Sequence, residues 1–491
     1  MADVVTQPAD PGTFAGAAGD GVSVPLVPVV ATRPASAPPR PYHFPRFDRR
    51  TLDNGATLIV APVPKLPIAT VLVLIEAGAV AEPRGQEGVA QLTAHTITEG
   101  TVRYDGEALT NRLERLGTAI DASADWDGTT LTFTVLTDKL RDAFVDLAEV
   151  LTAPTFPEAA VERIKGEQIA TILQVESEPR ELADEMFNAF AYADASRFSI
   201  PVSGTKHSVQ SLTRTDVLNF YRARYHPDGA TIIVVGDVET DAMEQLVYDA
   251  LAGTSHRWGE APLVPTPVID APARLTRALQ IVHKGDTPQS ELRLGHVSVP
   301  RSHPDYFKLT VANAILGGLF SSRINLNLRE AHGYTYGAHS EFDWRRAASP
   351  FLVSTAVASN VTAAALQETL YEIGRMRRDE VLESELSLAT SYLDGVFPIR
   401  FETTIAIASA LATLVMYDLP ADWYDSYRAH IRAVTTGDVL HMMRTHVDPD
   451  RLQIVVVGNA AVVQESLDAL RLGPVSVREV DPAMGRAVEP Q

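Results

Sequence analysis

Two stretches of the chain, "DVLNFYRARYHPDGATIIVVG" (216–236) and "DVLHMMRTHVDPDRLQIVVVG" (438–458), align with each other without a gap. Ten of the 21 positions are identical, and the offset is 222 residues throughout. Self-similarity at one fixed offset is typical of a duplicated structural unit. The sequence therefore predicts two homologous domains of about 220 residues in tandem.

The first copy begins with strands and continues with helices. "NGATLIVAPV" (54–63) starts with an Asn-Gly turn, "IATVLVLIEAGA" (68–79) is continuously apolar, and "TTLTFTVL" (129–136) alternates like a strand covered on one face. Helical spacing follows at 138–154 and at about 158–176, before the strand that ends the copy. Strands, several helices and a returning strand predict an α+β fold.

Composition sets the outer boundaries of these domains. Nine of the 32 prolines lie in the first 45 residues, a segment that cannot bury a core, and a second Pro-rich segment separates the two copies. The predicted organisation is a tail at 1–44, a first domain at 45–254, a linker at 255–275, a second domain at 276–475 and a C-terminal tail at 476–491.

Charge and cysteine content exclude several classes of function. The net charge of −20 argues against a general nucleic-acid binder, and an acidic surface would suit basic peptides. The chain has no cysteine, which excludes disulfides, thiol catalysis and thiolate metal sites. No apolar run approaches the roughly 20 residues that span a bilayer, so no membrane partner is expected. The first 20 residues lack the pattern of a secretory signal, so we expect a cytoplasmic protein, or a periplasmic one if a signal has been removed.

One helix of the first copy carries part of a known metal motif. In "GVAQLTAHTITEGT" (88–101), an inverted zinc motif His-x-x-Glu-His would occupy residues 91–95. Gln91 stands at the first histidine, Ala94 at the glutamate that acts as general base, and His95 at the second histidine. Glutamine is a poor zinc ligand and alanine cannot move a proton, so the motif is degenerate.

The tandem repeat, the position of this helix and three further segments resemble the pitrilysin/insulinase family of zinc metallopeptidases. The segments are "TEGT" (98–101), "PVSGTKHSVQSLTRTDVLNFYRARYHPDGATIIVVGDV" (201–238) and "LGGLFSSRINLNLREAHGYTYGA" (316–338). The resemblance covers about residues 42–475 and implies two α/β-roll domains that form half of a clamshell-like metallopeptidase.

The resemblance also implies a third zinc ligand, a glutamate on a later helix, and it places Thr171 at that position. Glu167 and Glu176 are the nearest replacements, and each would need a shifted helix. We therefore expect no metal and no cofactor in this chain, and we interpret His95 as a hydrogen-bonded helix histidine rather than a ligand. Two further histidine pairs, His332 with His339 and His441 with His446, lack i, i+4 spacing and are interpreted as surface residues.

The second copy retains a different part of the family's site. In "LREAHGYTYGA" (328–338), Arg329 and Tyr336 fall on the arginine and tyrosine that, in the family, hold the substrate backbone and stabilise the oxyanion. The alternatives are that Arg329 pairs within its own helix and that Tyr336 begins a strand. Tyr334 competes for the inward position, although strand alternation would place both tyrosines on one face. "LGGLFSSR" (316–323) is either a plain helix cap or a peptide-contacting loop.

The resemblance implies a division of labour between two chains, as in some bacterial members of the family. One chain carries the intact zinc motif, and a sister chain carries the Arg/Tyr pair. We expect this protein to be the second kind, inactive alone, forming a heterodimer whose chamber admits unfolded peptides and whose zinc lies in the partner. The alternatives are a structural scaffold subunit and a homodimeric peptide-binding protein.

Overall fold

The computed structural model describes residues 40–252, 258, 271–285, 287–480 and 487–488. Residues Pro41–Gln491 form one compact unit, separate from Met1–Arg40, and the description below concerns this unit. The predicted N-terminal tail (1–44) and the predicted linker (255–275) lie mostly outside the described residues.

The first half of the unit contains a six-stranded sheet in the order β1-β2-β6-β3-β5-β4. Apolar residues of its strands and helices, among them Val71, Phe133, Leu147 and Ile232, form one buried cluster. The strands are β1 (Asp48–Thr51), β2 (Thr57–Pro62), β3 (Ile68–Ile75), β4 (Asp121–Ala124), β5 (Thr129–Leu136) and β6 (Ala230–Gly236), and the helices are α1 (Val89–Thr96), α2 (Gly106–Arg115), α3 (Leu140–Thr152), α4 (Glu158–Ser177), α5 (Pro179–Ala191), α6 (Lys206–Ser211), α7 (Arg214–Arg224) and α8 (Thr240–Ala252).

The second half contains a seven-stranded sheet in the order β13-β12-β7-β11-β8-β10-β9. The strands are β7 (Ala278–His283), β8 (Gln289–Val297), β9 (Ala338–Phe342), β10 (Pro350–Ala358), β11 (Gln453–Gly458), β12 (Val475–Val480) and β13 (Ala487–Val488), and the helices are α9 (Tyr306–Asn313), α10 (Arg323–Asn325), α11 (Thr362–Arg378), α12 (Glu383–Val396), α13 (Thr404–Met416), α14 (Trp423–Arg432), α15 (Thr436–His446) and α16 (Ala460–Ala469).

Shorter helical turns complete the chain. Two π-helical segments interrupt the second half, where α9 runs into η5 and α10 runs into η6. The short segments are η1 (Ala79–Ala81), η2 (Thr137–Lys139), η3 (Arg197–Ser199), η4 (Pro227–Gly229), η5 (Ala314–Gly318), η6 (Leu326–Ala331), η7 (Ser359–Val361), η8 (Pro398–Phe401) and η9 (Pro449–Arg451).

Five strands of each sheet repeat in the same order and with the same directions, which confirms the duplication. β2 pairs in parallel with β6, and β3 pairs antiparallel with both β6 and β5, with β4 on the far side of β5. β7, β11, β8, β10 and β9 pair in the same order and with the same directions. Even the caps agree: Thr213 and Asp216 start α7 with a capping box, and Thr435 and Asp438 start α15 in the same way.

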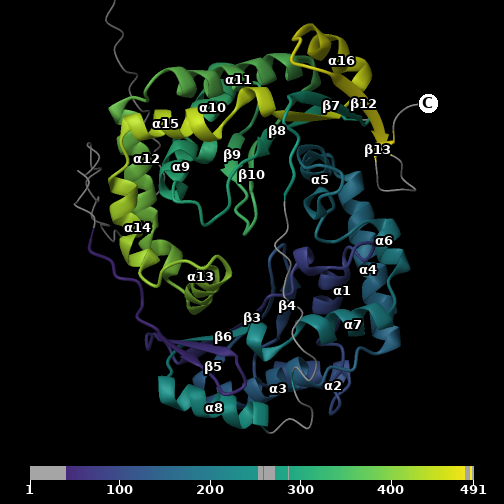
Figure 1. Ribbon diagram of the computed structural model, residues 1–491, viewed down its shortest axis with the longest axis vertical. Coiled ribbons are helices and arrows are strands. Elements are labelled where there is room, and N and C mark those ends of the chain that lie inside the picture. Colours follow the sequence, from purple (N-terminus) through teal and green to yellow (C-terminus); the bar gives the residue numbers. More distant parts are fainter. Residues whose placement is uncertain (1–39, 253–257, 259–270, 286, 481–486, 489–491) are drawn as a thin grey trace, which may run out of the picture. The chain divides into compact units, whose positions relative to one another are not determined.

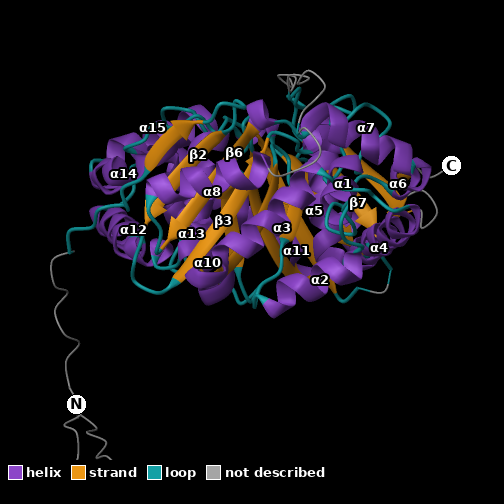
Figure 2. Ribbon diagram, turned by 90° about the horizontal axis from the view of Figure 1, so that it is seen from below, coloured by secondary structure: helices purple, strands orange, loops and turns teal. Residues whose placement is uncertain are grey.

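Each half lends one helix to the other half. α5 packs on β11 and β8 of the second sheet, and α13 packs on β6 and β3 of the first (Figure 1). Figure 2 shows the strands between flanking helices when the unit is seen from below. The two helices occupy equivalent positions in the repeat, so the exchange is reciprocal. We call α5 and α13 the exchanged helices.

Three details differ from what the sequence predicted. The second sheet continues beyond residue 475, because the alternating segment Val475–Val480 pairs in parallel with β7. Tyr336 does not begin a strand: β9 starts at Ala338, and both tyrosines of "YTYGA" lie in the loop before it. The edge strand β4 was not predicted, because it has only four residues, although these alternate in exposure as in a strand.

Within the described residues, no single helix has the length and apolarity to cross a bilayer. Only the segment Glu383–Phe401 taken together with α13 meets these two criteria, across a bend of 111°.

Candidate functional site

The degenerate motif lies on α1, which packs against α7 and α4 (Figure 1). Gly88 precedes the helix with a φ of 98°, a conformation that favours glycine, and an added Cβ would lie 2.5 Å from the carbonyl oxygen of Ser203. Ala94 is fully buried, while Gln91 and His95 are half-buried. The predicted first-ligand, base and second-ligand positions thus share one helix at the depth that a closed site requires.

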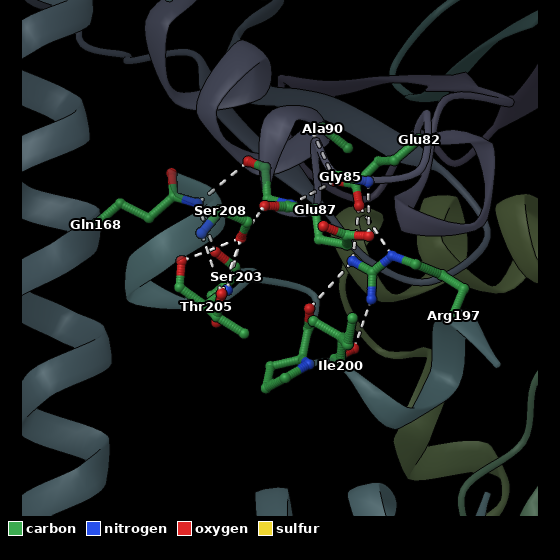
Figure 3. A network of polar contacts seen from close by, with 12 residues as sticks. Glu82, Gly85, Glu87, Ala90, Gln168, Arg197, Ile200, Ser203, Thr205 and Ser208 are labelled. Carbon is green, nitrogen blue, oxygen red and sulfur yellow. Dashed lines mark hydrogen bonds and ion pairs between the residues drawn. The ribbon is translucent and has the colours of Figure 1, made fainter. Parts of the chain in front are cut away.

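A buried ion pair holds the start of α1. The Glu82 carboxylate accepts hydrogen bonds from the backbone N–H groups of Gly88 (3.0 Å) and Ala90 (2.9 Å), and it pairs with the Arg197 guanidinium at 2.7 Å (Figure 3). Burial raises the pKa of Glu82 to about 7, against the opposing effects of Arg197 and the two N–H groups. The carboxylate acts as a helix cap supplied from outside the helix.

The same network ties α1 to the segment that follows α5. Arg197 also donates to the carbonyl of Ile200 at 2.5 Å. Gln168 of α4 donates to the carbonyls of Gly88 (3.1 Å) and Ser203 (2.7 Å), and Ser208 of α6 donates to the carbonyl of Glu87 (2.8 Å), as Figure 3 shows. The motif helix is therefore positioned by hydrogen bonds that involve none of its own motif side chains.

His95 is the one motif position that kept a metal-binding side chain. Desolvation lowers its pKa, against the smaller opposing effects of Asp121 and Glu167. Glu167 is thus the carboxylate of α4 whose charge affects the pKa of His95. It is paired with Arg163 at 2.8 Å, and Arg163 also holds Glu99.

Thr171, the predicted third-ligand position, is exposed and donates its hydroxyl to the carbonyl of Glu167 in its own helix. The side-chain oxygen of Gln91 is buried and has no hydrogen-bond partner within the described part of the chain. At this place the fold presents one imidazole, whereas a catalytic zinc needs three protein ligands and a base for its water.

Arg329 lies on the π-helical segment η6, with its side chain 34% exposed. Its guanidinium stacks over the ring of Phe320 at 4.5 Å and approaches Glu330 at 3.3 Å. The atom that approaches Glu330 is Nη1, which is buried and makes no contact of hydrogen-bond geometry among the described residues. The predicted pairing within its own helix therefore exists and leaves donor capacity unused.

Tyr336 is 92% exposed, the largest value among the exposed large apolar side chains of the described residues. Thr335 fixes the loop around it by accepting the Gly337 N–H at 3.0 Å and by a 3.0 Å hydroxyl contact with Thr355. Tyr334 is half-buried and stacks on His332, with ring centroids 5.0 Å apart. The two tyrosines therefore differ in environment, contrary to the alternation expected of a strand.

Tyr336 borders a cleft of about 650 Å³, within the size range of ligand sites. The cleft lies between α5 and the second sheet, and Phe320 also lines it, whereas Arg329 and Tyr334 do not. Arg293 in its wall pairs with Asp184 (2.5 Å) and Glu291 (3.0 Å). Further charged or titratable lining residues are Arg180, His339, Glu341 and Asp343.

Sequence reasoning missed two groups of residues. The Glu82–Arg197 pair joins positions 115 residues apart, and no local pattern reveals it. His446 was interpreted as a surface residue, and this is wrong. Its Nε2 lies 2.8 Å from Asp305 Oδ2, and its side chain is 9% exposed. The other three histidines of those pairs, His332, His339 and His441, are exposed as predicted.

Comparisons with known proteins agree with the sequence interpretation. The family model described as insulinase (peptidase family M16) matches residues 59–204, and the model described as the peptidase M16 inactive domain matches residues 211–393. A Bacillus subtilis protein described as the uncharacterized zinc protease YmxG is 23% identical over 357 residues, which cover 72% of this chain and 85% of that protein. The Helicobacter pylori "non-peptidase homolog YmxG" is 22% identical over 400 residues, covering 80% and 90%.

Solved structures show the same fold. The crystal structure of a peptidase M16 inactive domain from Pseudomonas fluorescens superposes with a TM-score of 0.78 at 24% identity, covering 84% of this chain and 98% of that one. With two matching domain models, the repeated sheets and the motif helix without its base, the chain belongs to the insulinase (M16) family of peptidases as an inactive, peptidase-like member.

Proposed function

We propose that this chain is the non-catalytic subunit of a two-chain zinc peptidase. In this proposal the sister subunit carries an intact inverted motif and the zinc, and this chain supplies Arg329 and Tyr336 to peptide bound between the two. The observation that carries the proposal is Tyr336, a phenol that is 92% exposed on a loop held by hydrogen bonds.

No described residue of the chain covers the side chain of Tyr336. A tyrosine normally buries its ring and leaves its hydroxyl at the surface, because ring burial is favourable. Here the whole side chain projects at the edge of a polar cleft. An exposed aromatic group on a fixed loop is suited to contact a molecule outside the chain.

Arg329 supports the same proposal. Its guanidinium plane is fixed by the Phe320 ring and its Nη1 atom has no hydrogen-bond partner among the described residues. The guanidinium as a whole is 34% exposed, and a pre-positioned cation that solvent still reaches is suited to a peptide carbonyl or to a developing negative charge. The Phe320 ring, itself 71% exposed, would keep the guanidinium in place without consuming its donors.

In the assembled enzyme the zinc of the sister subunit would polarise the scissile carbonyl and activate water. This chain would hold the peptide backbone with Arg329 and donate the Tyr336 O–H to the oxyanion. Its own α1 would contribute no proton transfer, because alanine occupies the base position.

The first experiment is co-purification of the tagged chain from its native cells. We expect a stoichiometric partner whose sequence contains an intact His-x-x-Glu-His motif. Recovery of membrane-complex components would favour the scaffold alternative, and recovery of the chain alone as a dimer would favour the peptide-binding alternative.

The second experiment measures peptide cleavage by the reconstituted pair. Tyr336→Phe removes one donor with little change in volume and should lower turnover by roughly 10²–10³-fold. Arg329→Ala should also raise KM, because it removes a backbone contact. Zinc content and subunit assembly should not change.

Tyr334→Phe is the matched control, because Tyr334 lies two residues away in the same loop and does not line the cleft. It should leave turnover within about twofold. If Tyr336→Phe and Arg329→Ala behave like this control, the chain forms a wall of the chamber and not part of the active site.

A further inference from the structure

A second group of metal-ligand side chains lies on the other half of the chain. It consists of His303, Asp305 and His446, each with one ligand atom within 4.8 Å of the other two. Among the described residues, this is the one group of three or more His, Asp and Glu side chains that lie this close together. His303 and Asp305 belong to the turn before α9, and His446 is the last residue of α15. None of the three belongs to the degenerate motif.

The side chains already point toward a common centre. His446 Nε2 lies 2.8 Å from Asp305 Oδ2, and His303 Nδ1 lies 3.8 Å from the same oxygen. The two imidazole rings are 5.1 Å apart and nearly perpendicular. Ligand atoms around a tetrahedral zinc ion are separated by ~3.3 Å, given metal–ligand distances of ~2.0–2.1 Å. The observed separations lie on both sides of this value, so small side-chain rotations would suffice.

The local backbone is arranged around these side chains. Asp305 stands at the N-cap of α9, yet its carboxylate makes no capping bond and turns instead to His446. The N–H of Asp305 donates to the lone pair of His303 Nδ1 at 3.2 Å, so an ion bound at this nitrogen would take the place of that hydrogen bond. Backbone bonds from His303 to Pro300 and from Tyr306 to His303 close the turn on both sides.

Solvent reaches the site, and the nearby positive charge is neutralised by an acidic partner. The side chains of His303 and Asp305 are 28% and 29% exposed, so an ion has access. The nearby cation Lys308 is paired with Asp438 at 2.7 Å.

We propose that His303, Asp305 and His446 form a binding site for a divalent transition-metal ion, zinc by preference, that joins the start of α9 to the end of α15. Two imidazoles and one carboxylate are a ligand set that zinc accepts, with water in the fourth position. Among the described residues the group contains no second carboxylate to act as a base, so the site binds the metal without catalysing hydrolysis. It is independent of the proposed sister subunit.

The test is a zinc titration of the metal-free, untagged chain by calorimetry at pH 7.5. Binding should saturate at ~1 Zn²⁺ per chain, and zinc should raise the melting temperature by a few degrees. Co²⁺ in place of zinc should give the visible absorption of a tetrahedral nitrogen and oxygen site.

Three variants and two controls assign the ligands. His446→Ala and His303→Ala should weaken binding by more than the ~10–100-fold that loss of a ligand's hydrogen-bond partner costs. Asp305→Asn keeps the size and an acceptor for His446 while it removes the carboxylate, so it separates ligand loss from misfolding. His441→Ala, on an exposed position of α15, and His95→Ala should bind zinc like the unaltered chain.

Three results of the zinc titrations would overturn the proposal. A chain that takes up no zinc overturns the proposal, as does zinc binding that survives all three ligand variants. Binding that depends on His95 would also overturn it, and would show that the degenerate motif still holds metal.

Discussion

The motif helix of the first half and the Arg/Tyr loop of the second half differ most in burial. On α1 the base position is a fully buried alanine, and the neighbouring glutamine buries an oxygen that has no partner among the described residues. In the loop, Tyr336 is almost wholly exposed. Zinc ligands clustered at a buried site without their metal would be desolvated and unpaired, which lowers the stability of the fold. An exposed phenol has almost no effect on stability. The fold therefore does not need the zinc motif, because residues outside the motif position α1.

The largest effect should come from the ion pair that positions α1. Arg197→Ala leaves the Glu82 carboxylate buried and uncompensated, and should lower the free energy of unfolding by ~3–5 kcal/mol. Urea denaturation measures it. Arg163→Ala, which breaks a half-exposed pair on α4, is the control and should cost at most ~1 kcal/mol. If Arg197→Ala and Arg163→Ala lowered the free energy of unfolding equally, the Glu82–Arg197 pair would not be what holds α1 in place.

A half-buried carboxyl on α5, that of Glu185, makes the stability of the chain depend on pH. Burial, followed by the neighbouring Glu176, Glu181 and Asp184, raises the pKa of Glu185 from 4.5 to about 8. The folded state therefore holds this proton more tightly, and stability falls as pH rises through that interval. Glu185→Gln should remove this fall, so its stability relative to the unaltered chain should rise steadily as the pH increases from 5 to 8.

Urea denaturation across pH checks the prediction for Glu185. Glu181→Gln, at an exposed position one turn earlier, removes only one of the smaller contributions to this shift and should keep most of the fall. A Glu185→Gln profile parallel to that of the unaltered chain would show that Glu185 is solvated.

The unpaired oxygen of Gln91 predicts a smaller gain. Gln91→Met keeps an unbranched side chain of similar length and removes a buried acceptor without a partner among the described residues. It should stabilise the chain by ~1 kcal/mol. Gln174→Met, at an exposed position of α4, should change stability by less than ~0.5 kcal/mol. A loss of stability in Gln91→Met would mean that this oxygen has found a partner.

The smallest effect should be that of Tyr336→Ala on stability, within ~0.5 kcal/mol, because almost none of the ring is buried. Thermal unfolding of the isolated chain checks it. A loss of more than ~1 kcal/mol would contradict the exposed position and would complicate any effect of this residue on turnover.

The duplication, the fold class and the family were predictable because each rests on patterns within the sequence. The offset of 222 residues locates equivalent strands in the two copies, and the sheets pair as that offset requires. The spacing of the motif positions Gln91, Ala94 and His95 is enough to place them on one helix.

Contacts between distant segments were not predictable. Nothing near Glu82 in the sequence points to Arg197, and nothing near His446 points to Asp305, because these pairs form only when separate elements pack. The loop holding Tyr334 and Tyr336 was misjudged for another reason: its aromatic and threonine residues favour a strand, and tertiary contacts of Thr335 hold it in a loop instead.

The exchanged helices α5 and α13 bear on how such a chain folds and how it arose. Neither half alone would cover its sheet, so a separated half should expose an apolar surface and associate with itself. Two copies of one half, related by two-fold symmetry, would restore both contacts, each copy giving its helix to the other. The present chain is then equivalent to a helix-swapped dimer joined into one polypeptide, and cutting it between the halves should not release either one.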